Sequence, residues 1–162
     1  TYHGIAATVE SVHQTIRERG PFDVLIGFSQ GAMLATILTA LNQQPEALSC
    51  PPFSNYTGDL RPLAPEYHWK LVLLVGGMLP RDTYIQRSLL RVPPSIPSVH
   101  LYGAADSMLP LSKSLAEWWG SAGTEVTEVQ HSEGHRFPSK PKDYEAVKQA
   151  FARQLEERVG QL

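Results

Sequence analysis

The sequence has a single cysteine, Cys50, and therefore cannot form an intrachain disulfide. Disulfides are common in small secreted proteins and rare in reducing compartments. The scarcity of cysteine predicts a cytoplasmic protein that depends on a hydrophobic core for its stability. Such a core is feasible because 42% of the 162 residues are hydrophobic, enough for one compact domain over residues 1–162 and too few for two.

The sequence also has little excess charge and no long apolar run. Fourteen basic residues are scattered among sixteen acidic ones, and the net charge is −2. Nucleic-acid-binding surfaces need clustered basic residues, so we expect a neutral or apolar small molecule as the partner and no nucleic acid. The longest apolar runs, such as 71–75, are too short to span a membrane, and residues 1–14 lack the features of a signal peptide.

What the sequence does contain is a regular alternation of two patterns. Short apolar runs predict strands at 24–28, 71–75, 98–102 and 125–130. Helical spacing of apolar residues predicts helices over 5–16, 33–41, 84–90, 111–119 and 144–155, whereas 43–68 has no clear period and is interpreted as a long connection. Strands that alternate with helices predict an α/β fold, a parallel sheet with helices on both faces, in which strand 24–28 is buried.

The segment Gly27-Phe28-Ser29-Gln30-Gly31 matches the G-x-S-x-G pattern of a nucleophilic serine. It lies between a predicted strand and a predicted helix, which is the context that gives this pattern meaning. We expect a strained turn at Ser29, with glycines at 27 and 31 because larger side chains would collide there with the strand and the helix. The backbone N–H of Gln30, at the start of the helix, is the candidate donor to a developing oxyanion.

A serine hydroxyl needs a base to remove its proton, and the base needs a group that orients it. His131 and His135 follow the last predicted strand, where this architecture places its base. We favour His135, because Gly134 lets the loop turn sharply, whereas His131 is expected at the strand end. Asp106 is the preferred acid, since the small residues after strand 98–102 present it at the sheet edge, and Asp82 is the alternative.

These residues, and the loops around them, allow other interpretations as well. The two histidines and Asp106 are not expected to bind a metal, because Gly134 and the strand-end setting break the spacing that a helical metal-binding pair uses. Five apolar residues on the loops expected around Ser29 have two equally good interpretations, the lining of an acyl pocket or ordinary packing: Met78, Leu79, Met108, Leu109 and Phe137.

Several segments together resemble the FSH family of small serine hydrolases, within the α/β-hydrolase superfamily. The resemblance rests on the Ser29 motif with the preceding 20–23, on 75–77, on 102–106 followed by Leu109-Pro110, and on His131 with Gly134-His135, which occur in the order of the family. It implies hydrolysis of carboxylic esters or thioesters, without a cofactor, by Ser29, His135 and Asp106. An acyltransferase that uses the same three residues is a further possibility.

The sequence departs from the family before strand 24–28. Family members have several earlier strands and a His-Gly segment that supplies the second oxyanion donor, whereas a single helix precedes this strand here. Loss of one such donor typically costs about 10² to 10³ in rate. We therefore expect a fold without its N-terminal strands, whose open strand edge pairs in a homodimer or with a complementing N-terminal segment. The alternative function is a catalytically silent fragment that acts as a binding or interaction module.

Overall fold

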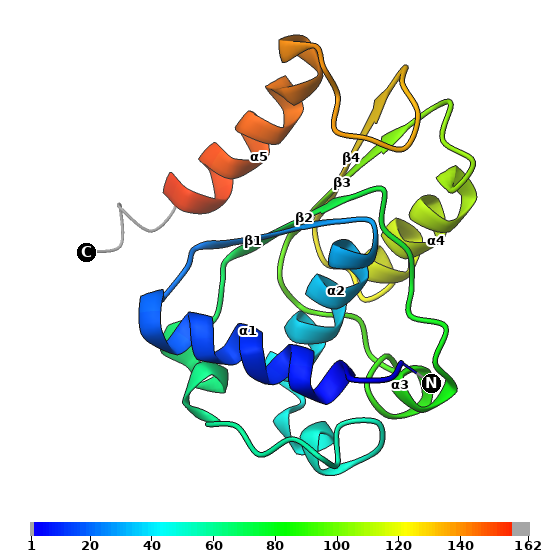
Figure 1. Ribbon diagram of the computed structural model, residues 1–162. Helices are drawn as coiled ribbons and strands as arrows, with labels where there is room; N and C mark the ends of the chain where they lie inside the picture. Colours follow the sequence, from blue (N-terminus) through cyan, green and yellow to red (C-terminus); the bar gives the residue numbers. More distant parts are fainter. Residues whose placement is uncertain (1, 157–162) are drawn as a thin grey trace.

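A computed structural model describes residues 2–156 and contains a parallel four-stranded sheet in the order β1-β2-β3-β4 (Figure 1). The strands and helices lie where the sequence patterns predict them. The strands are β1 (Val24–Phe28), β2 (Leu71–Val75), β3 (Ser98–Gly103) and β4 (Val126–His131). The helices are α1 (Ile5–Arg19), α2 (Gln30–Gln43), α3 (Thr83–Ser88), α4 (Leu109–Gly120) and α5 (Glu145–Glu156).

Helices cover both faces of the sheet, as predicted. On one face Val72 and Leu74 pack against α1, α2, α3 and α4, with Trp119 of α4 fully buried. On the other face Leu73 and Leu101 pack against α5, which lies on the opposite side of the sheet from α1 and α2 in Figure 1. Every residue of β2 and β3 is buried between these two layers, which explains the unbroken apolar sequence of β2.

The prediction that β1 is buried was wrong. β1 is an edge strand, and Ile26 and Phe28 are 53% and 38% exposed. By register, Ile26 is beside Leu73 of β2 and faces the same side of the sheet. Among the described helices α5 packs on that side, mainly against β4, and the cluster it joins reaches β1 only at Val24. The apolar run was read correctly as a strand, and its outer edge is open as expected, but one of its faces is exposed as well.

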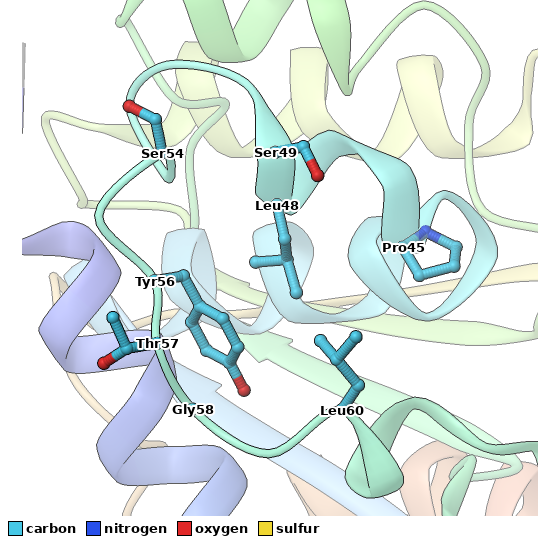
Figure 2. Close-up of a pocket in the computed structure, with 8 residues that line it drawn as sticks. All are labelled: Pro45, Leu48, Ser49, Ser54, Tyr56, Thr57, Gly58 and Leu60. Carbon is cyan, nitrogen blue, oxygen red and sulfur yellow. The ribbon is translucent and has the colours of Figure 1, made fainter.

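The connection over 43–68 is ordered by three short 3₁₀ turns (Pro45–Ser49, Arg61–Leu63 and Pro65–Tyr67) and by Phe53, which is fully buried. It surrounds a hollow of about 480 Å³, where the side chains of Leu48, Tyr56 and Leu60 point toward one another (Figure 2). Tyr56 also hydrogen-bonds to the buried His13 of α1, which ties the connection to that helix. None of the three proposed catalytic residues lines this hollow.

The open face of β1 predicts a difference between two neighbouring apolar residues. Leu73→Ala should lower the free energy of unfolding by about 2–4 kcal/mol, because Leu73 is only 5% exposed and its removal leaves a cavity. Ile26→Ala should cost less than about 1 kcal/mol, because the Ile26 side chain is half in solvent. Urea unfolding of both variants tests this, and equal losses would mean that β1 is covered in solution.

Candidate active site

Ser29 lies in a strained turn between β1 and α2. Its φ of 54° and ψ of −116° make it the single non-glycine residue with positive φ among those the structure describes. Its backbone N–H donates to the carbonyl oxygen of Val75 at 2.8 Å, which links the turn to the end of β2. The strained turn predicted at this position is therefore present, and it directs the serine side chain out of the strand end.

The two glycines of the motif have different surroundings. A Cβ at Gly27 would lie 2.4 Å from the carbonyl oxygen of Gly31 and 2.6 Å from Cα of Ala32, so position 27 has no room for a side chain. A Cβ at Gly31 would meet nothing within 4 Å. The steric reason given for glycine was correct at position 27 and wrong at position 31, where the described residues leave open space.

The structure brings Ser29, His135 and Asp106 together in a hydrogen-bonded chain. The Ser29 hydroxyl donates to Nε2 of His135 at 2.9 Å, and Nδ1–H of His135 donates to Oδ2 of Asp106 at 2.7 Å. The second carboxylate oxygen of Asp106 accepts the backbone N–H of Met108 at 2.8 Å. The Asp106 side chain is fully buried at the start of α4, where the helix dipole favours its negative charge.

The loops that carry Asp106 and His135 are joined through their backbones. The N–H groups of Ala104 and Ala105 donate to the carbonyl oxygens of His131 and Glu133. A side chain at Gly103 would lie 2.1 Å from the Glu133 carbonyl oxygen, so this close approach requires glycine. The separation of the acid from the base is thus set by the pairing of β3 with β4, which continues into the two loops.

The loop that carries His135 is stabilised by the side chain of Glu133. Its carboxylate accepts the hydroxyl of Ser139 at 2.6 Å and the backbone N–H of Ser139 at 2.9 Å. These hydrogen bonds hold the pKa of Glu133 below its usual range. Arg136 lies 3.2 Å from the same carboxylate. The loop therefore closes on itself on both sides of His135.

Gly76 provides the surface on which the His135 ring rests. It has a φ of +54°, and a Cβ there would lie 2.9 Å from Cε1 and 3.0 Å from Nδ1 of His135. On its other side the His135 ring packs against Phe28 at a centroid distance of 5.0 Å. The sequence marked Gly76 as the end of a strand but gave no signal of this contact, because a contact between segments distant in sequence has no local pattern.

The two alternative residues, His131 and Asp82, and a further buried histidine, His100, have structural roles. His131 is buried at the end of β4, and its Nδ1 accepts the backbone N–H of Glu133. Asp82 accepts the N–H groups of Tyr84 and Ile85 at the start of α3. His100 is buried within β3, and burial lowers its pKa to about 3, so it stays neutral. Of these residues, none has a hydrogen bond to Ser29 in the described part of the chain.

The five predicted pocket residues separate into two groups. Met78 and Met108 line a cavity of about 330 Å³ next to Ser29, together with Tyr2, Gln30, Met33 and Arg81. Leu79 packs against the core, Leu109 begins α4, and Phe137 stacks on Phe28 at 5.5 Å. The sequence analysis missed Met33 and Arg81; Met33 was assigned to the apolar face of α2, although its position one turn after Gln30 places it beside the motif.

The described residues hold neither a cluster of metal ligands nor a membrane-spanning helix. No group of three or more metal-ligating side chains is arranged as a metal site in that part of the chain. No helix there is long and apolar enough to cross a membrane.

Residues 1–147 match the serine hydrolase (FSH1) family. The chain belongs to this family. Human esterase OVCA2 is 36% identical over 138 residues, which are 84% of this chain and 52% of OVCA2. The Drosophila melanogaster esterase CG5412 is 30% identical over 156 residues, which are 95% of this chain and 48% of that protein. The chain thus spans about half the length of the curated relatives it matches.

The fold of this serine hydrolase is also that of solved structures. Maize acyl-protein thioesterase 2 superposes with a TM-score of 0.64 over 94% of this chain and 65% of its own, at 19% sequence identity. At that identity the comparison supports the fold alone. The resemblance to the FSH family that the motifs indicated is confirmed, and so is the expected α/β fold.

The contact between Gly76 and His135 predicts a specific effect of adding one methyl group. Gly76→Ala should displace the His135 ring. Gly123→Ala is the control, because it places a side chain at a similar positive φ of +80°, where the added Cβ meets nothing within 4 Å. Both variants should lose about 1–2 kcal/mol of stability. Only Gly76→Ala should shift the NMR signal of the His135 ring, identified by its loss in His135→Gln. An unchanged signal would contradict the contact.

Proposed function

We propose that the chain cleaves carboxylic esters or thioesters through a Ser29-His135-Asp106 triad and an acyl-enzyme intermediate. The observation that carries this proposal is the pair of hydrogen bonds, at 2.9 Å and 2.7 Å, that joins the serine to the histidine and the histidine to the aspartate. This is the geometry that lets a histidine act as general base toward a serine. The esterase names of the relatives support the same class of substrate.

The chemistry follows from the three side chains. Ser29 Oγ attacks the carbonyl carbon while its proton passes to Nε2 of His135, and the ionised Asp106 stabilises the resulting imidazolium. Collapse of the tetrahedral intermediate breaks the bond to the alcohol or thiol, which leaves with the proton from His135. Water then attacks the acyl-serine with His135 again as base, which releases the acid and restores Ser29.

One donor to the oxyanion comes from the turn itself. The backbone N–H of Gln30 is the first of α2 and has no acceptor among the described residues. It points from the start of a helix, where the dipole favours negative charge. The second donor is proposed to come from a segment beside β1, because the open edge of that strand adjoins the Ser29 turn.

The triad is tested by the rate at which a fluorophosphonate probe labels the purified chain. Ser29→Ala and His135→Gln should abolish labelling, and Asp106→Asn should slow it by roughly 10²- to 10⁴-fold, because the imidazole loses its orienting carboxylate. Matched controls are His131→Gln and Asp82→Asn, which remove a buried histidine and a helix cap at the two alternative positions. Both should keep the wild-type labelling rate in the folded fraction.

Each result separates the candidates. Labelling that survives Ser29→Ala, or equal rates for Asp106→Asn and Asp82→Asn, would contradict the proposed triad. A folded wild-type chain that takes up no probe would contradict catalysis by this chain alone. It would favour the second candidate, an interaction module, which the open edge of β1 and the exposed Ile26 and Phe28 support.

We further infer that the open edge of β1 pairs with another strand, either from a second copy or from a complementing segment. The N–H of Ser29 and the carbonyl oxygen of Asp23 point toward β2. Because alternate residues of a strand direct their backbone groups to opposite edges, those of Ile26 and Phe28 point away from β2. Unpaired groups of this kind bind other strands.

Hydrogen exchange measured over a range of protein concentrations tests this pairing. If copies pair through β1, the Ile26 amide becomes protected as concentration rises, and sedimentation shows a dimer. A peptide that complements the edge should protect the same amide without dimerisation, with the Leu73 amide, inside the sheet, as the protected reference. Fast exchange of Ile26 at every concentration and with every candidate segment would contradict the inference.

A further inference from the structure

The cavity lined by Gln30, the residue after Ser29, combines two features. All three methionines of the sequence, Met33, Met78 and Met108, line it. They come from three different segments: α2, the loop after β2 and the start of α4. Methionine side chains are flexible and polarisable, so they adapt to acyl chains of different shape. Gln30, whose backbone N–H is the proposed oxyanion donor, also lines this cavity. The cavity therefore lies next to the proposed oxyanion position.

The second feature is one cation at the same cavity. Arg81 lines it and is exposed, and in the described part of the chain its guanidinium has neither a salt bridge nor a side-chain hydrogen bond. No acidic residue lines the cavity. The neighbouring carboxylate of Asp82 is directed to the N–H groups of Tyr84 and Ile85. The charge of Arg81 is thus available to a ligand.

The loop that carries Arg81 is fixed in place. Its backbone N–H donates to the hydroxyl of Tyr2 at 2.8 Å, and Tyr2 itself lines the cavity. Beyond Arg81, Asp82 caps α3 and so holds the far side of the loop. A guanidinium on a fixed loop loses less entropy when it binds a planar anion, which its parallel N–H groups hold in a bidentate manner.

We propose that Arg81 selects substrates that carry an anionic group, a carboxylate or a phosphate, at a distance from the ester or thioester. The methionines hold the apolar part and Arg81 binds the anion. This inference rests on the proposed function, because it assigns the substrate class of the same site. The anion can belong to the acid side, as in a half-ester of a dicarboxylic acid, or to the leaving group, as in a coenzyme A thioester.

The test is a binding experiment that does not require turnover. Methyl-¹³C-methionine labelling of the Ser29→Ala chain gives three NMR signals, and all three report on this cavity. The acid-side pair is hexanamide and the monoamide of adipic acid, which differ by one carboxylate. The leaving-group pair is the hexanoyl thioester of N-acetylcysteamine and that of coenzyme A. We expect the anionic member of one pair to bind about tenfold more tightly.

Variants assign this preference to Arg81. Arg81→Gln should abolish it, Arg81→Lys should keep part of it, and Arg91→Gln, which removes the same charge outside the cavity, should leave it intact. The pair that shows the preference identifies which side of the substrate carries the anion. Equal binding within both pairs, a preference that survives Arg81→Gln, or methionine signals that do not move would overturn the inference. Fluorophosphonate labelling of the wild-type chain reports separately on the proposed hydrolysis.

Discussion

The site depends on one backbone constraint, the positive-φ conformation of Ser29 between β1 and α2. This conformation is unfavourable for a residue with a side chain, and the surrounding structure must hold it in place. The hydrogen bond from Ser29 N–H to Val75 fixes the turn to the neighbouring strand, and the close contact of Gly27 with α2 sets the angle at which the helix leaves. The same turn exposes the serine hydroxyl and the Gln30 N–H.

From this turn, the parallel sheet positions the other two residues. The carboxyl ends of β1, β3 and β4 lie at one edge of the sheet, so the loops that follow them converge although they are about 75 and 30 residues apart in sequence. Gly76 and Gly103 make this convergence possible, because each occupies a place where a Cβ would collide with the loop that carries His135. The histidine is therefore placed by close backbone approaches as well as by the contacts of its own ring.

The sequence was sufficient to predict the strands, the helices and the proximity of the three polar residues, because each has a local signature: an apolar run, a helical period, or a polar residue after a strand. It was insufficient for features that depend on contacts between segments distant in sequence, such as the exposure of a strand or the lining of a cavity. The run at 24–28 looks like β2 and β3, and the missing earlier strands predicted its open edge, yet apolar content alone did not indicate that one face of β1 is also exposed. The sequence did not predict that Arg81 and Met33 line the cavity, because they lie on segments that meet only in the folded chain.

The open edge of β1 and the chemistry at Ser29 are physically linked. Phe28 immediately precedes Ser29, and its ring packs against both His135 and Phe137. A strand that paired with β1 would therefore lie near His135, the proposed general base, and would exclude water from one side of it, which strengthens electrostatic interactions there. Gly31 faces open space in the same turn, so the approach of a further segment meets no side chain. Occupancy of the edge and the reactivity of Ser29 should accordingly rise together.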